Sequence, residues 1–186
     1  MRAYMVSDGE FLSARQSELN QIISRFLSEH GFAVSQKVIA RDELAFCRGC
    51  FDCWTKTPGE CAIHDSIADI NRACMTSDVV VYLCPVVFGQ FSANIKSAVD
   101  RWLPNMLPFF TTRKDGSTMH PPRYPDYPKQ IFLAYGDSLT DEEAKVFSDI
   151  TMKHRSSVEM MIDRGNDDEI LLSLSGISLQ RVGGSL

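Results

Sequence analysis

Short apolar runs alternate along the chain with longer segments in which apolar residues recur at helical spacing. The first pattern is typical of strands and the second of helices with one buried face. Residues 78–84 (DVVVYLC) form a continuous, largely β-branched run, which predicts a strand covered on both faces. Strands are predicted at residues 2–6, 32–40, 78–84, 130–135 and 169–174.

Helices are predicted between these strands, at residues 13–31, 67–74, 92–104 and 140–165. Ser13 and Gln16 have the spacing of a capping box, and Ser92 can cap the third helix. The last and longest helix is expected to carry Phe147, Val158 and Met161 on its apolar face and to end at Gly165. No helix is expected after the last strand.

Strands that alternate with helices predict an α/β fold, an open parallel sheet of five strands with helices on both faces. We expect one domain over residues 1–186, with a Cys-rich loop at 45–65 and a Pro-rich excursion at 104–129. Ligands of such sheets bind beyond the carboxyl ends of the strands. Chemistry is therefore expected in the loops after the first, third and fourth strands.

The net charge limits which classes of partner the chain is expected to bind. Nineteen Lys and Arg against 24 Asp and Glu give a net charge of −5 over 186 residues, which disfavours nucleic acid and anionic membranes as partners. No apolar run approaches the ~18 residues of a membrane span, and the first ten residues lack the apolar centre of a signal peptide. We expect a cytoplasmic protein. A reducing compartment disfavours structural disulfides, so the six cysteines need another explanation.

Cys47, Cys50, Cys53 and Cys61 fall in one segment, CRGCFDCWTKTPGEC, with the spacing C-x2-C-x2-C-x7-C. Two-residue spacers let thiolates converge on one centre, and thiolates suit zinc or iron–sulfur clusters. Structural zinc sites usually have two separated cysteine pairs, so this spacing favours a [4Fe–4S] cluster over zinc. Thiols in a loop that holds no metal are the alternative. We expect the other two cysteines, Cys74 and Cys84, in the core.

A second segment, PVVFGQFSANIKSAVDR, follows the predicted buried strand. It contains Pro85, Val86, Val87, Phe88, Gly89 and Ser92. Lys96 follows, and Asp100-Arg101 ends the segment. Together with the cysteine segment and His64-Asp65, it resembles the flavodoxin-fold NAD(P)H-dependent FMN reductases. The likeness is greatest to their cysteine-bearing branch, which includes the iron–sulfur flavoproteins. It is specific over about residues 45–104.

The resemblance implies an FMN-dependent oxidoreductase that takes electrons from NAD(P)H or a reduced carrier, and a homodimer or homotetramer. It places the flavin ring beside the backbone of residues 85–89 and near Ser92, with Gly89 allowing close approach and Phe88 packing near the ring. It assigns the phosphate to the start of the first helix, at Ser13, Arg15, Gln16 and Ser17. Tyr135, Gly136 and Asp137 would lie beside the same pocket, where the Tyr135 ring could stack on the flavin. No catalytic side chain is expected, because the flavin carries the chemistry.

The phosphate loop departs from the family pattern of Gly-Ser-Pro-Arg. Here the corresponding residues include Asp8 and Glu10, which are poor neighbours for a phosphate dianion. The family's tyrosine in the flavin loop is Val87 in this chain. The alternative function is therefore a non-catalytic, flavodoxin-like binding or redox-sensing protein whose phosphate loop has decayed.

Overall fold

The computed structural model describes residues 1–154 and 158–183. Its centre is a parallel sheet in the order β2-β1-β3-β8-β9, which is the strand order of flavodoxin-like folds. These strands are β1 (Arg2–Asp8), β2 (Ala33–Ile39), β3 (Val79–Val87), β8 (Lys129–Tyr135) and β9 (Val158–Ile162). The predicted fold class is confirmed.

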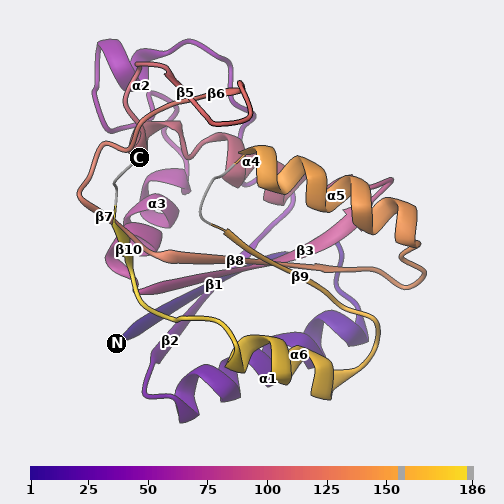
Figure 1. Ribbon diagram of the computed structural model, residues 1–186. Coiled ribbons are helices and arrows are strands. Elements are labelled where there is room, and N and C mark those ends of the chain that lie inside the picture. The colour runs from indigo at the N-terminus through magenta and orange to yellow at the C-terminus, as the bar shows by residue number, and fades with distance from the viewer. Residues whose placement is uncertain (155–157, 184–186) are drawn as a thin grey trace.

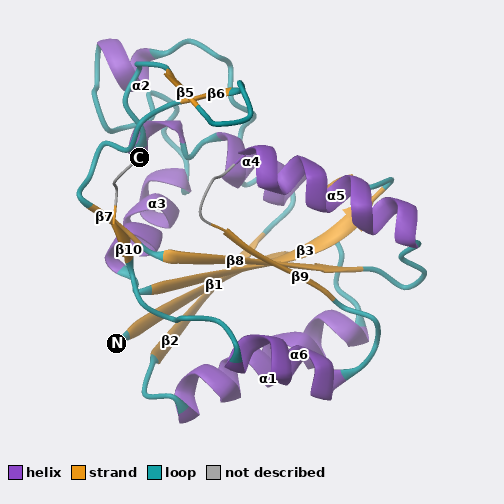
Figure 2. Ribbon diagram, viewed as in Figure 1, coloured by secondary structure: helices purple, strands orange, loops and turns teal. Residues whose placement is uncertain are grey.

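Helices cover both faces of the sheet (Figures 1 and 2). One face carries α1 (Ala14–Glu29) and α6 (Asp167–Ser175), and the other carries α3 (Ile67–Thr76), α4 (Ala93–Asp100) and α5 (Asp141–His154). Alternate residues of β1 serve the two layers: Ala3 and Met5 belong to one apolar cluster, and Tyr4 and Val6 to the other. None of the described helices is long and apolar enough to cross a membrane.

The predicted buried strand is the centre of the core. All six residues of the segment 79–84 are at most 1% exposed, and they alternate between the two clusters. Cys84 is among them, and Cys74 is equally buried on α3, so the prediction that both are core residues is confirmed. Burial raises the pKa of the Cys84 thiol well above its usual value, which keeps that thiol neutral.

The sequence prediction was wrong in the last third of the chain. The expected helix 140–165 is α5 followed by strand β9, with residues 155–157 outside the described part. The expected strand 169–174 lies in α6, whose first turn is acidic and whose N-cap Asn166 accepts a hydrogen bond from the Asp168 N–H. Ile170 and Leu174, four residues apart, are the buried positions of that helix. The short runs VEMMI and EILLSL were ambiguous by period, and Asn166 was the overlooked helix-start signal.

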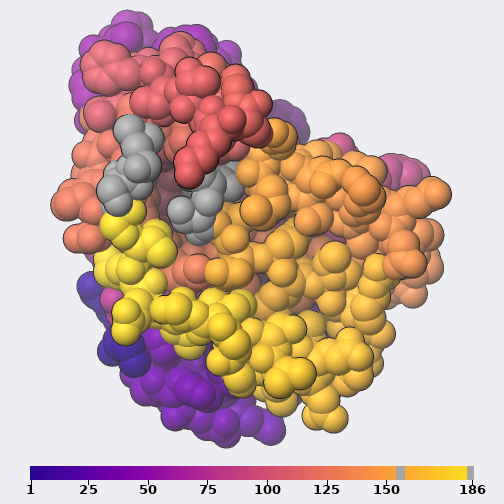
Figure 3. All heavy atoms as spheres, viewed as in Figure 1, coloured from indigo at the N-terminus to yellow at the C-terminus, as the bar shows by residue number. Residues whose placement is uncertain are grey.

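Two excursions gather at one end of the molecule (Figures 1 and 3). The first is the cysteine segment with the short α2 (Asp52–Thr55). The second follows α4 and contains the 3-10 turn η1 (Leu103–Asn105), the hairpin β5 (Thr111–Thr112) and β6 (Thr118–Met119), and β7 (Asp126–Tyr127). The final strand β10 (Val182–Gly183) pairs with β7. Trp54 joins the excursions, because its indole N–H donates to the carbonyls of Leu103 (3.1 Å) and Met106 (3.0 Å).

Candidate functional site

The loop after β3 is a tight hairpin. Beyond the parallel sheet, β3 continues to Val87 and pairs antiparallel with β4 (Gln90–Phe91), leaving Phe88 and Gly89 as the turn. Both turn residues have positive φ, +51° at Phe88 and +71° at Gly89, as in a type I′ turn. Left-handed backbone costs a phenylalanine about 1–2 kcal/mol. Phe88 is nevertheless 90% exposed, so this strained turn presents an uncovered aromatic ring at the carboxyl edge of the sheet.

Gly89 packs against α5. It is buried, and a Cβ built there would lie 3.1 Å from Val146 Cγ1 and 3.5 Å from the Glu143 carbonyl oxygen, both on α5. The missing side chain therefore makes room for α5. The positive φ requires glycine at this position independently.

A buried carboxylate ends the first strand. Asp8 is 0% exposed, and its carboxylate accepts hydrogen bonds from Ser92 Oγ (2.5 Å), Asn94 Nδ2 (2.8 Å) and the Glu10 N–H (2.8 Å). Ser92 is the N-cap residue of α4, so this contact ties the end of β1 to the start of that helix. Asn94 was missed by the sequence reasoning, because nothing in the local pattern shows that it faces Asp8.

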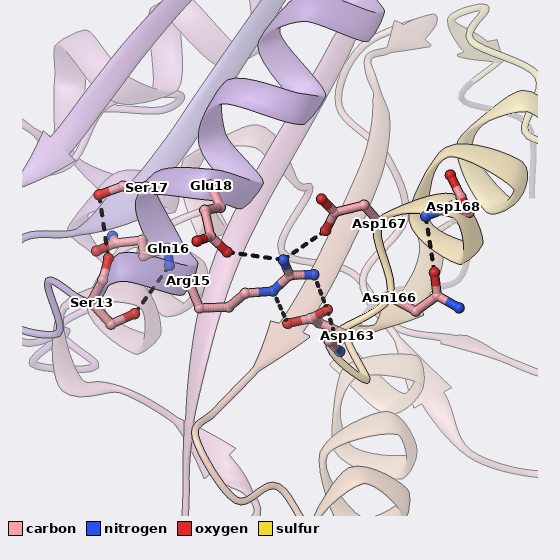
Figure 4. Close-up of polar contacts among 10 residues, drawn as sticks. Ser13, Arg15, Gln16, Ser17, Glu18, Asp163, Asn166, Asp167 and Asp168 are labelled. Atoms are coloured by element: carbon pink, nitrogen blue, oxygen red, sulfur yellow. Dashed lines mark hydrogen bonds and ion pairs between the residues drawn. The ribbon is translucent and has the colours of Figure 1, made fainter.

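The first turn of α1 is largely occupied with its own structure (Figure 4). Ser13 Oγ accepts from the Gln16 N–H (3.0 Å), as the capping-box spacing predicts, and Ser17 Oγ donates to the Ser13 carbonyl (3.3 Å). The Gln16 side chain does not complete the box. Its Nε2 donates instead to the Asp8 carbonyl (2.9 Å), and its Oε1 is buried without a partner among the described residues.

Arg15 is held by carboxylates from distant elements. Its Nε and Nη2 lie 2.8 and 2.6 Å from the two Asp163 oxygens, and its Nη1 lies 2.7 Å from Asp167 and 3.2 Å from Glu18 (Figure 4). The bidentate hydrogen bonds to Asp163 raise the pKa of Arg15. The pKa of Asp163 is lowered: burial works to raise it, and the bonds from Arg15 outweigh that effect. The sequence reasoning missed both aspartates, because it placed Asp163 inside a helix over residues 140–165 and Asp167 between that helix and a strand at 169–174. In the structure, Asp163 directly follows β9 and Asp167 begins α6.

Tyr135 lies at the carboxyl end of β8 but faces inward. Its ring is 3% exposed and packs in the cluster beneath α1 and α6, so it offers no face for stacking. Burial raises the pKa of its hydroxyl, and the nearby Cys84 and Asp8 raise it further. That hydroxyl has no hydrogen-bond partner in the described part of the chain. Gly136 and Asp137 follow it at the surface.

The four clustered cysteines surround one small cavity of about 20 Å³. Cys47 and Cys50 are exposed, Cys61 is half-buried and Cys53 is buried on α2. Burial raises the pKa of Cys53, and the three neighbouring thiols raise it further. Across the described residues, no group of three or more His, Cys, Asp or Glu side chains is placed to hold a single metal ion.

Arg101 organises the wall of this cavity. Its side chain is 1% exposed, and the guanidinium pairs with Asp65 and donates to Cys61 Sγ (3.3 Å) and the Ile63 carbonyl (3.0 Å). Asp65 also accepts from the Ala45 N–H (3.0 Å), and the Arg101 bonds lower its pKa against the opposing effect of burial. The sequence reasoning noted His64-Asp65 and Asp100-Arg101 without predicting this contact. Arg101 thus fixes both ends of the cysteine segment to α4.

Comparisons with known proteins agree with this picture. No family model matches the chain. It is 33% identical to an iron–sulfur flavoprotein of Archaeoglobus fulgidus over 78 residues (42% of this chain and 34% of that protein). It is 31% identical to an iron–sulfur flavoprotein of Methanocaldococcus jannaschii over 93 residues (50% and 47%). The matches thus span between a third and a half of these curated relatives.

Solved structures share the fold over nearly the whole chain. An NAD(P)H:quinone oxidoreductase of Methanothermobacter marburgensis superposes with a TM-score of 0.63 at 15% identity, covering 94% of this chain and 93% of that one. An FMN-dependent NADH-azoreductase of Bacillus anthracis, solved with FMN, gives 0.52 at 12% identity and 93% coverage of both. The resemblance predicted from the two sequence segments is confirmed.

Proposed function

From the flavodoxin-like sheet and the sequence likeness to iron–sulfur flavoproteins, we propose that this chain is an FMN-dependent oxidoreductase that takes electrons from NAD(P)H or a reduced carrier. The observation that carries the proposal is the β3–β4 hairpin. It sets a strained, exposed Phe88 at the carboxyl edge of the sheet, where ligands of this fold bind. Exposed Gly136 and Asp137 end the neighbouring strand at the same edge.

The residues at this edge fit the ring of a flavin. A flat aromatic ligand can cover the ring of Phe88 and offset the exposure of its apolar face. Val86 and Val87 are half-buried beside it and add apolar surface, while the hairpin backbone can hydrogen-bond the polar edge of the ring. Pro85 and Ser92, which flank this hairpin in the chain, are buried. When bound, the flavin supplies hydride and electron transfer; these residues orient it and exclude water.

The cysteine segment fits an iron–sulfur cluster in its donor set. Cys47, Cys50, Cys53 and Cys61 line one cavity, and soft thiolates are the ligands that such clusters take. In a [4Fe–4S] cluster each cysteine binds a different iron, so the four sulfurs stand further apart than they would around one ion. We propose these four as the ligands of a [4Fe–4S] cluster that would relay single electrons.

We also propose that the chain forms a homodimer or homotetramer through the end of the molecule that carries both excursions. Phe46 and Phe51 of the cysteine segment and Phe109 and Phe110 of the Pro-rich excursion are all exposed. Large apolar side chains gathered at one end are typical of an interaction surface. The six free cysteines support a reducing, cytoplasmic location.

The absorption spectrum of the purified protein tests the flavin. We expect bound flavin, supplied by FMN reconstitution where needed, and its bleaching under anaerobic conditions by NADH or NADPH. Phe88→Ala is the matched variant. It should bind flavin more weakly and still fold, because the fold does not depend on a ring that is exposed. A protein that is purified without flavin and binds none on reconstitution with FMN would refute the proposal. That result would favour the non-catalytic, redox-sensing alternative.

Iron and acid-labile sulfide, measured anaerobically per chain, test the cluster. Each Cys→Ser change at positions 47, 50, 53 and 61 should remove the cluster, because an open iron position is prone to oxidation and loss. Cys74→Ala is the control, since Cys74 is a core thiol on α3. A parent protein without iron, or iron unaffected by Cys53→Ser and Cys61→Ser, would remove the cluster and leave the flavin proposal intact.

A further inference from the structure

The structure around the start of α1 points to a flavin site that does not recognise the terminal phosphate: we propose that riboflavin and FMN bind this chain with similar affinity. This inference rests on the proposed function and concerns the ligand class of the same site. In the related family the phosphate belongs at the start of the first helix. In this chain the side chains there are engaged with the chain's own carboxylates and carbonyls.

The cation expected to meet a phosphate is already neutralised. Both Asp163 oxygens accept from Arg15 in a bidentate pair, and Asp167 and Glu18 accept from its Nη1 (Figure 4). Bidentate guanidinium–carboxylate contacts are among the stronger charge-assisted hydrogen bonds. A phosphate would have to displace Asp163, which is itself buried, and leave that carboxylate without its partner.

A second carboxylate, Asp8, occupies one backbone donor of the loop between β1 and α1. Asp8 already accepts from the Glu10 N–H, a backbone donor between β1 and α1, and from Ser92 and Asn94. The Glu10 carboxylate also accepts from Asn94 Nδ2 (3.0 Å) and pairs with Arg41 Nε (3.0 Å). A dianion brought here meets the buried Asp8 carboxylate, whose negative charge opposes the attraction of the helix start.

One buried hydrogen-bond acceptor in the first turn of α1 lacks a donor. Gln16 is 4% exposed, and its Oε1 is a buried acceptor with no partner among the described residues. The bond from its Nε2 to the Asp8 carbonyl fixes which end of the amide is the oxygen. A phosphate dianion has only acceptors and cannot satisfy this oxygen. A ribityl hydroxyl, present in riboflavin and FMN alike, can donate to it.

These contacts disfavour a terminal phosphate at the start of α1 and leave the neutral part of the ligand unaffected. The ring and ribityl hydroxyls supply the binding free energy, and the phosphate adds as much repulsion from the carboxylates as attraction to the helix start. The affinity for FMN should therefore depend little on salt, because no net charge is neutralised on binding.

Flavin fluorescence quenching by the full chain, with FMN and riboflavin as separate probes, tests this inference. We expect dissociation constants within about threefold of one another, and a ratio that stays constant in Arg15→Gln. In Asp163→Asn, Arg15 loses its buried, bidentate partner and keeps only the exposed Asp167 and Glu18, so it can turn to a phosphate. FMN affinity should then rise about tenfold while riboflavin affinity stays unchanged. Asp149→Asn, which removes an exposed partner of Lys145 on α5, is the charge-matched control and should change neither.

The ratio of the two affinities separates recognition from folding, because a structural defect at α1 weakens both ligands together. FMN binding at least tenfold tighter than riboflavin in the native chain, with the preference lost in Arg15→Gln, would overturn the inference and leave the proposed function standing. If the chain binds neither flavin, the proposed function itself fails. Thermal unfolding of each variant shows whether the loss of a contact has damaged the fold.

Discussion

Replacement of Phe88 by glycine should stabilise the fold and weaken flavin binding at the same time. Phe88 has φ +51° in the hairpin turn, which costs an L-residue about 1–2 kcal/mol. Glycine removes that cost but brings about 0.5–1 kcal/mol of extra chain entropy in the unfolded state. Because the ring is 90% exposed, little buried apolar surface is lost. The net gain should be about 0.5–1 kcal/mol.

The assay has two readouts and one matched variant. For a chain of this length a gain of that size raises the melting temperature by about 2 °C. Loss of the aromatic contact with a flavin ring, about 1–1.5 kcal/mol, should weaken flavin binding about tenfold. Phe88→Ala removes the same ring but keeps a Cβ in the left-handed region. It should weaken flavin binding equally and gain no stability.

A higher melting temperature together with weaker flavin binding in Phe88→Gly would show that the strained turn is retained for ligand binding. The reasoning is refuted by a Phe88→Gly protein that is less stable than the parent, since the backbone strain would then be absent. It is equally refuted by unchanged flavin affinity in both variants, which would separate the hairpin tip from the flavin.

Three further predictions concern charged and titrating groups. Arg101→Gln should cost about 3–5 kcal/mol in urea unfolding, because it leaves Asp65 half-buried without its partner, whereas Arg72→Gln, which removes an exposed ion pair, should cost under about 0.5 kcal/mol. Because the pKa of Asp163 is lowered in the folded state, its pairing with Arg15 stabilises the fold above the unfolded pKa, and this stabilisation is lost as the pH falls below about 4. Asp163→Asn should make the unfolding free energy depend less on pH in this acid range. An unchanged pH dependence would contradict the pairing. Burial raises the pKa of Tyr4 to about 12, so the fold should lose about 2–3 kcal/mol between pH 10 and 12, where the unfolded chain ionises first, and Tyr4→Phe should make that alkaline loss smaller.

The sequence by itself determined the parts of this protein that depend on local pattern. The β-branched run at 78–84 could only be buried as a central strand, and it is the centre of the sheet. Ser13 and Gly31 mark the ends of α1 because capping and positive φ are set by residues a few positions apart. The cysteine spacing placed four thiols close enough to share one cavity. In each case the interacting residues are near neighbours along the chain.

Only the tertiary structure decided what those residues face. VEMMI could be helix or strand by its period, and pairing with β8 made it β9. That pairing brought Asp163 to Arg15 across 148 positions of sequence and altered the expected phosphate site. In the same way, α5 packs against Gly89, and Arg101 reaches Cys61 from 40 positions away. Contacts between distant segments depend on the packing of whole elements, and no local periodicity encodes which charges will meet there.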